Sequence, residues 1–122
     1  MKNEVKQMVN AQEIVERHLE TGDHIAYTWP ASFKETNGKI VLSKEKLFFI
    51  EEKGFIFTTA NLMWEVSYKT ISRTDVREPN QLVVHADSGE YIIETQYLSN
   101  LAEAVAWFLK KETAEEALTI PA

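Results

Sequence analysis

The chain has 122 residues, which fits a single domain with a hydrophobic core of its own. It contains no cysteine, so disulfides, thiol catalysis and thiolate metal sites are excluded. Its formal net charge of −6 disfavours binding to nucleic-acid backbones and strong attraction to anionic membranes. No continuous apolar run typical of a signal peptide or a membrane span occurs, so we expect a cytoplasmic protein.

The first predicted element is an amphipathic helix over residues 4–20. Its charged residues fall mostly on one side of the helical wheel, and Gly22 follows where a helix commonly stops. The apolar residues recur at three- and four-residue spacing: Val5, Met8, Val9, Ala11, Ile14, Val15 and Leu19.

From residue 24 onward a period of two predicts β-strands. The first covers residues 24–33 and is interrupted at Pro30, which marks an edge, a bulge or a bend because proline cannot donate to a strand ladder. The Asn-Gly pair at residues 37–38 predicts a hairpin turn, and residues 39–43 form the returning strand.

Further runs of apolar and β-branched residues predict the rest of an antiparallel sheet. The run after residue 55 continues irregularly through Leu62, Trp64 and Val66, and Gly89 lies in the last hairpin turn. The remaining strands are predicted over residues 46–51, 55–59, 68–77, 81–86 and 91–95.

A second amphipathic helix is predicted near the end, with its N-cap at Ser99. Lys110 and Lys111 lie near its C-terminal end, where cations favour the helix dipole. Residues 1–20 are therefore interpreted as an N-terminal helix, residues 21–111 as the domain and residues 112–122 as an extension or tail. The apolar stripe of the helix is Leu98, Leu101, Ala102, Val105, Phe108 and Leu109.

These elements predict a mainly β, α+β fold, with seven antiparallel strands framed by two helices. The core is predicted from strand alternation and from the helical stripe. Its members are Ile40, Leu42, Leu47, Phe49, Phe57, Ile71, Leu82, Val84, Ile93, Leu101, Val105 and Phe108.

Three stretches carry a resemblance to a known family: GKIVLSKEKLFF at residues 38–49, VSYKTI at residues 66–71 and GEYII at residues 89–93. Together with the order of seven strands and a closing helix, they resemble the pleckstrin-homology-like (PH-like) superfold, in its bacterial PH and GRAM-type branch. The resemblance covers residues 21–111. It implies a seven-stranded antiparallel sheet or partial barrel with a C-terminal capping helix, to which the N-terminal helix is an addition.

The resemblance also implies a candidate anion site. Lipid-binding PH domains hold the headgroup with a lysine and an arginine on the first two strands. Lys34 and Lys39 lie near those places, Lys44 follows in the next turn, and Val41 stands where the arginine is expected. Because arginine grips phosphate with a bidentate fork, its absence weakens this hypothesis. The alternative is that these lysines keep strand edges soluble, and the sequence favours it.

No pattern of residues predicts catalysis, a metal or a cofactor. The three histidines, His18, His24 and His85, lack the spacing of metal ligands. Glu51 and Glu52 adjoin a predicted turn, where carboxylates are usually solvated. The serines lack the glycines of a nucleophile elbow, and the four glycines form no phosphate-binding loop.

The run over residues 46–51 is apolar on both faces, so one core cannot take all its side chains. Phe48 and Ile50 need a cover, which is either the first helix or another protomer, in direct contact or by exchange of that helix. Trp107 falls beside the apolar stripe of the last helix and is expected to be partly exposed, as at a contact surface. Phe48, Ile50 and Trp107 are thus the predicted interface residues.

The sequence therefore predicts a non-catalytic interaction or assembly module without a cofactor. Its expected partner is a protein or a second copy of itself, since bacterial PH domains assemble into oligomers as a family, and nucleic acid is not expected. The alternative is weak peripheral binding of anionic lipid headgroups through Lys34, Lys39 and Lys44.

Overall fold

The computed structural model describes residues 10–54 and 59–119. Within them the chain forms two α-helices, a 3₁₀ turn and seven strands, all in one sheet. The elements in chain order are α2 (Ala11–Glu16), β1 (Ile25–Phe33), β2 (Thr36–Ser43), β3 (Lys46–Lys53), β4 (Thr59–Ser67), η1 (Tyr68–Thr70), β5 (Ile71–Arg77), β6 (Gln81–Ala86), β7 (Gly89–Glu94) and α3 (Leu98–Thr119).

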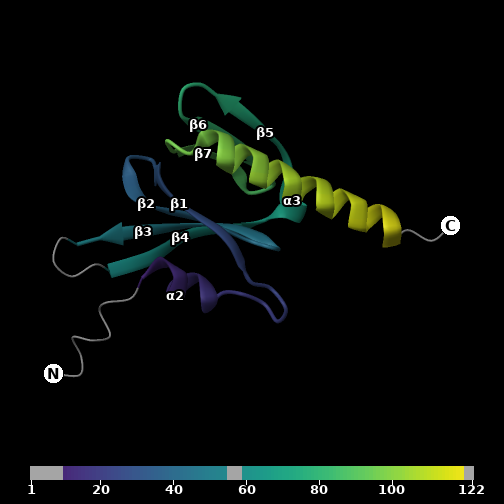
Figure 1. Cartoon of the computed structure of the whole chain (residues 1–122), viewed down its shortest axis with the longest axis horizontal. Coiled ribbons are helices and arrows are strands. Elements are labelled where there is room, and N and C mark those ends of the chain that lie inside the picture. Colours follow the sequence, from purple (N-terminus) through teal and green to yellow (C-terminus); the bar gives the residue numbers. More distant parts are fainter. Residues whose placement is uncertain (1–9, 55–58, 120–122) are drawn as a thin grey trace.

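The sheet has the order β4-β3-β2-β1-β7-β6-β5, and every pairing is antiparallel. Its two parts, β1–β4 and β5–β7, are joined only where Ser32 pairs with Glu94 and Phe33 with Ile93. Figure 1 shows α3 lying along the β5–β7 part and α2 lying under the β1–β4 part. The predicted mainly β architecture, with seven antiparallel strands, a closing C-terminal helix and an additional helix before the first strand, is confirmed.

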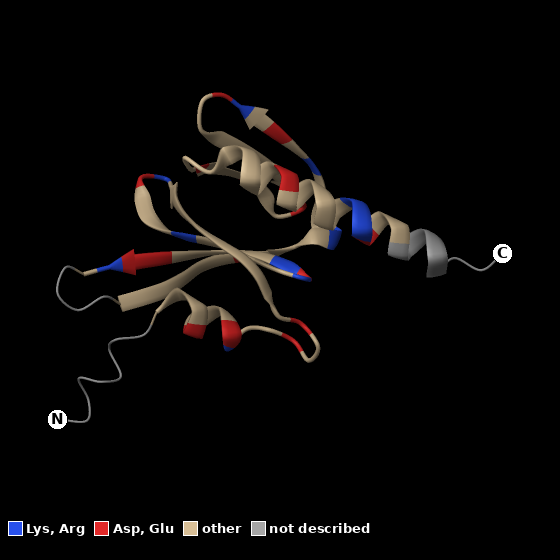
Figure 2. Cartoon of the chain, viewed as in Figure 1, with Lys and Arg blue, Asp and Glu red and all other residues tan. Residues whose placement is uncertain are grey.

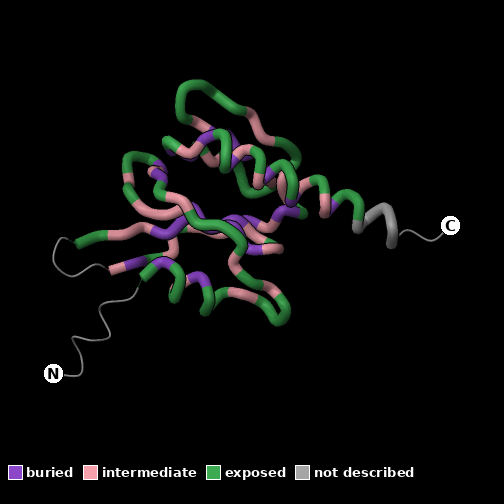
Figure 3. Tube along the Cα trace, viewed as in Figure 1, coloured by how far each residue is buried: buried purple, intermediate pink, exposed green. Residues whose placement is uncertain are grey.

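The larger core lies between the two parts of the sheet and α3 (Figure 3). Leu101, Val105 and Phe108 of α3 pack here. The predicted core is confirmed at ten of its positions, whereas Ile71 is only partly buried and Phe57 lies outside the described residues. The ten are Ile40, Leu42, Leu47, Phe49, Leu82, Val84, Ile93, Leu101, Val105 and Phe108.

A second, smaller core lies between β3 and α2. Phe48 and Ile50 are fully buried there, in contact with Ala11 and Val15 of α2. The second apolar face of β3 is therefore covered by α2 of the same chain. Of the two possibilities considered from the sequence, the structure contains the intramolecular helix. In this structure Phe48 and Ile50 are consequently not accessible to a partner.

The hairpin turn between β1 and β2 differs from the prediction. The Asn-Gly pair at residues 37–38 lies inside β2, and the turn is formed by Lys34 and Glu35, both with positive φ. Gly38 has another role: a Cβ built on it would lie 1.9 Å from the Ile50 carbonyl oxygen. Glycine is required there because β2 and β3 approach too closely for any side chain, not because the chain turns.

Both helices also differ from the prediction at their ends. Of the predicted helix over residues 4–20, the described part is helical only over Ala11–Glu16, with Asn10 as N-cap accepting from the Glu13 N–H. The last helix starts at Leu98, so Ser99 is not its N-cap, and it continues to Thr119. Figure 1 shows its final turns extending past the sheet.

The predicted strands differ from those observed in three smaller respects. The strand β1 is not interrupted at Pro30, which lies within it and pairs with Lys39 of β2. The predicted strand over residues 55–59 falls mostly outside the described residues, and the irregular continuation to Val66 is the strand β4. The predicted strand from residue 68 begins instead with the 3₁₀ turn η1.

Candidate functional site

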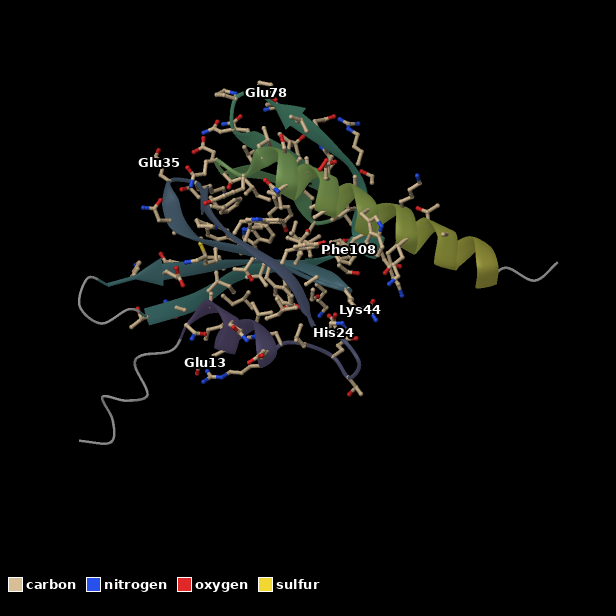
Figure 4. The ribbon with its side chains drawn as sticks, viewed as in Figure 1. Glu13, His24, Glu35, Lys44, Glu78 and Phe108 are labelled. Carbon is tan, nitrogen blue, oxygen red and sulfur yellow. The ribbon has the colours of Figure 1, made fainter. Side chains whose placement is uncertain are left out.

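The three lysines proposed as an anion site do not converge. Lys34 lies in the β1–β2 turn and Lys44 follows the other end of β2, an eight-residue strand that spans about 26 Å. Figure 4 shows this separation, with Glu35, the neighbour of Lys34, at one end of the hairpin and Lys44 at the other.

The surroundings of Lys34 and Lys39 are acidic. Lys34 borders a depression of about 300 Å³ that is also lined by Glu35, Glu90 and Glu94. The Lys39 ammonium donates to the Glu52 carboxylate at 2.7 Å, so its charge is already compensated. An anionic headgroup would meet net negative charge at this end of the sheet.

Lys44 belongs to a different place, a groove between the first half of β1 and the middle of α3. This groove, named here the β1–α3 groove, has a volume of about 340 Å³. Figure 4 shows Lys44 and Phe108 on the two sides of this region, under α3. The lining residues are Ala26, Tyr27, Lys44, Trp107, Phe108 and Lys111.

Stacked aromatic rings form the floor of the groove. Tyr27 stacks on Trp29, with centroids 5.2 Å apart, and meets Phe108 edge-on at 6.5 Å. Phe108 also contacts Trp107 edge-on at 5.1 Å and stacks on the buried ring of Tyr68 at 5.0 Å. Tyr27 and Trp107 nevertheless remain 48% and 59% exposed. The floor of the groove therefore packs on other rings on one side and is accessible to solvent on the other.

A bulge in β1 turns Tyr27 toward the groove. Ile25 pairs with Ser43 and Tyr27 with Leu42, so β1 has one residue more than β2 in this interval. Such a bulge shifts the alternation of side chains between the two faces. Ile25 therefore packs with the α2 core, whereas Tyr27 stacks on Trp29 beside α3.

The groove exists because β7 ends early. β7 accompanies β1 only at Ser32 and Phe33, after which the chain turns away and α3 begins at Leu98. The Thr95 hydroxyl donates to the Pro30 carbonyl at 2.8 Å and fixes this departure. Beyond that point β1 faces α3 instead of a strand. An adjoining depression of about 280 Å³ shares Tyr27 and Trp107 with the groove. Its lining is Tyr27, Trp29, Asn100, Glu103, Ala104 and Trp107.

A partly buried network of hydrogen bonds holds the backbone that carries Lys44. Asp23 accepts from the Lys44 N–H at 2.8 Å and from the Ser43 hydroxyl at 2.7 Å. The Tyr68 hydroxyl donates to the Ser43 carbonyl at 2.9 Å. Burial of Tyr68, and secondarily the charge of Asp23, raise the pKa of Tyr68 well above its ordinary value, so the donor stays protonated.

The cations of the groove differ from the other lysines of the sheet. Lys39 and Lys46 are paired with Glu52 and Glu65, each at 2.7 Å. Within the described part of the chain, neither Lys44 nor Lys111 has a carboxylate within 4.0 Å. The Lys111 ammonium lies 5.5 Å from the centre of the Trp107 ring, in a cation–π contact. Figure 2 shows blue segments on α3 and at the nearby end of β2 and β3.

Of the three predicted interface residues, only Trp107 is accessible, and it lines the groove. Sequence reasoning did not single out Tyr27 or Lys111 for this site. Lys111 lies one helical turn after Trp107, so helical spacing could have joined that pair. Nothing local could have revealed the bulge that directs Tyr27.

The histidines contact different groups. His85 contacts Asp75 through Nε2 at 2.7 Å and Glu90 through Nδ1 at 3.2 Å, across three neighbouring strands. This hydrogen bond, with the Arg73 charge, lowers the pKa of Asp75. His18 instead contacts the Ile14 carbonyl oxygen. Within residues 10–54 and 59–119, no group of three His, Asp or Glu side chains is positioned to hold a metal ion.

No protein-family model matches this sequence, and no curated protein matches it. Among solved structures, it is similar to the solution structure of the N-terminal PH domain of human ARAP2. The two are 11% identical, with a TM-score of 0.48 over 85% of this chain and 90% of that one. None of the described helices has the length and apolar character needed to cross a membrane.

Proposed function

We propose that this chain is a non-catalytic PH-like interaction module that binds a protein partner in the β1–α3 groove. The observation that carries the proposal is the open aromatic floor formed by Tyr27 and Trp107, beside Lys44 and Lys111, which have no carboxylate within 4.0 Å among the described residues. Exposed aromatic side chains on rigid elements are typical of protein contact surfaces and supply most of their binding energy.

Binding rather than catalysis is favoured by the chemistry of the lining. Among the residues whose side chains the structure describes, the titratable ones lining the groove are Tyr27, Lys44 and Lys111. This described lining offers no carboxylate, imidazole or thiol that could exchange a proton near neutral pH. What it offers is apolar area and positive charge.

Weak binding to anionic lipids is the alternative. Lys34, Lys39 and Lys44 point to no common site, and the net charge of −6 opposes approach to an anionic surface. We expect little retention of the protein on phosphatidylserine vesicles containing phosphoinositides at physiological salt. Strong retention that is lost in Lys39→Ala would favour the lipid alternative.

The proposal is tested by affinity chromatography with three immobilised proteins: wild type, Trp107→Ala and Ile92→Ala. Ile92 is a matched control because it is an exposed apolar residue on β7 that does not line the groove. We expect one or more proteins from a lysate of the source cells to be retained by wild type and Ile92→Ala, and lost by Trp107→Ala. Retention that is equal on all three columns, or no retention, would contradict a role for the groove.

A further inference from the structure

The β1–α3 groove and its adjoining depression together follow β1 and α3. One side is the β1 edge from Ala26 to Pro30, about 13 Å of extended chain. The other side is the α3 face from Asn100 to Lys111, about 16 Å of helix. The two depressions described above lie end to end between them and share Tyr27 and Trp107. These dimensions fit an extended segment of roughly five residues.

The β1 side of the groove offers a free strand edge. β1 pairs with β2 from Ile25 to Phe33, but on its other side it pairs with β7 only at Ser32 and Phe33. Among the described residues, the backbone groups of residues 25–29 that face away from β2 have no strand partner. An unpaired edge of this kind accepts an extended peptide as an added strand, with main-chain hydrogen bonds giving affinity and side-chain pockets giving specificity.

The charged side chains differ between the two ends of this surface. Lys44 and Lys111 lie at the end beside Ala26, where none of the carboxylates that the structure describes lines the groove. Glu103 and Asn100 line the adjoining depression, beside Trp29. A bound segment is therefore favoured when it places negative charge near the two lysines and neutral or positive groups near Glu103.

Resting on the proposed function above, we propose that the groove binds a short extended peptide in which an apolar side chain precedes one or more carboxylates. The apolar side chain lies on the floor of Tyr27 and Trp107. A peptide antiparallel to β1 runs from the Pro30 end to the Ala26 end, so its later residues meet Lys44 and Lys111. Antiparallel pairing is the more stable of the two orientations.

An anionic membrane fits the same lysines less well. Glu45 follows Lys44 directly and is exposed, and Glu20 is exposed close by, 3.6 Å from the Lys46 ammonium. The Glu45 carboxylate next to Lys44 and the Glu20 carboxylate beside Lys46 repel a flat anionic surface, whereas an extended peptide contacts only the lining of the groove, including Lys44 and Lys111.

The experiment is selection of random dodecapeptides displayed on phage against the wild-type chain. We expect enriched peptides to share an apolar residue followed within a few positions by aspartate or glutamate. The same selection on Lys44→Glu/Lys111→Glu should lose this motif. The matched control is Lys34→Glu/Lys110→Glu, which changes the net charge equally at two lysines that do not line the groove, and it should keep the motif.

A synthetic peptide carrying the enriched motif then measures affinity by fluorescence anisotropy. We expect about tenfold weaker binding to Lys44→Glu/Lys111→Glu, and roughly thirtyfold weaker binding to Trp107→Ala. A peptide with the same composition in reverse order should bind more weakly to the wild type. In NMR spectra, the indole signals of Trp29 and Trp107 should shift on binding more than that of Trp64, which packs against Phe49 in the core.

The outcomes separate this inference from the proposed function. Enriched peptides that require Trp107 but carry no carboxylate, or that bind the lysine double variant equally well, would overturn the inference and leave the groove as a protein-binding site. If no enriched peptide depends on Trp107, both fail. Binding of the wild type to phosphatidylserine vesicles that is lost in Lys44→Glu/Lys111→Glu, with no peptide selected, would assign the lysines to a membrane surface instead.

Discussion

At Gly38 the backbones of β2 and β3 leave no room for a side chain, since a Cβ there would lie 1.9 Å from the Ile50 carbonyl oxygen. We expect Gly38→Ala to lower the free energy of unfolding by about 1–3 kcal/mol, because the two strands must separate to admit the methyl group. Chemical denaturation measures this loss. The neighbouring exposed residue provides the control: Asn37→Ala should change stability by less than about 0.5 kcal/mol. Equal stability of the two variants would contradict the close approach.

Tyr68 makes the stability sensitive to alkaline pH. Because burial raises the pKa of Tyr68 in the folded chain, the protein loses stability as pH rises above about 10, where the unfolded chain ionises first. Below that pH the contribution is fully present. Tyr68→Phe should lower the free energy of unfolding by about 1 kcal/mol at neutral pH, because the hydrogen bond to Ser43 is lost. The free energy of unfolding of this variant should then decrease less steeply than that of the wild type as the pH rises toward ~11. Denaturation curves over this range test it.

At the scale of elements, α2 and β3 stabilise each other. The six residues of α2 are too few for a stable helix in isolation, so the helix depends on burying Val15 against Phe48 and Ile50. We expect Phe48→Lys to destabilise the protein by at least about 3 kcal/mol, since it removes a core ring and buries a charge. Thermal unfolding measures this effect. Met63→Lys, an apolar-to-lysine change at an exposed position of β4, should have little effect. Similar losses in both variants would show that α2 does not cover Phe48.

For the whole molecule, the position of α2 changes the expectation about self-association. The sequence left open whether the first helix or a second protomer covers Phe48 and Ile50, and in the structure α2 of the same chain covers them. We therefore expect light scattering to find the single-chain mass of 14.0 kDa, with a midpoint of unfolding independent of protein concentration. A doubled mass with concentration-dependent stability would indicate that α2 is exchanged between protomers. A doubled mass that Trp107→Ala abolishes would place a second copy in the β1–α3 groove.

Most of the strands and the main core could be predicted from the sequence, because alternation and helical periodicity are local consequences of burial on one face. Leu42, Phe49, Leu101 and Val105 lie where these periods place them. The pattern also showed that β3 is buried on both faces. It could not show which surface covers the outer face, because that depends on where α2 packs in space.

The site itself was decided by tertiary structure. The sequence singled out Trp107 and Lys44, but 63 positions separate them, and no local period relates them. They meet because β7 ends after Glu94 and lets α3 take its place beside β1. The Asn-Gly signal at residues 37–38 was wrong about the turn because packing of Gly38 against β3 outweighs turn propensity. Local periodicity thus determined the elements and their buried faces, whereas the bulge at Tyr27, the register of β2 and the β1–α3 groove arose only from contacts between distant segments.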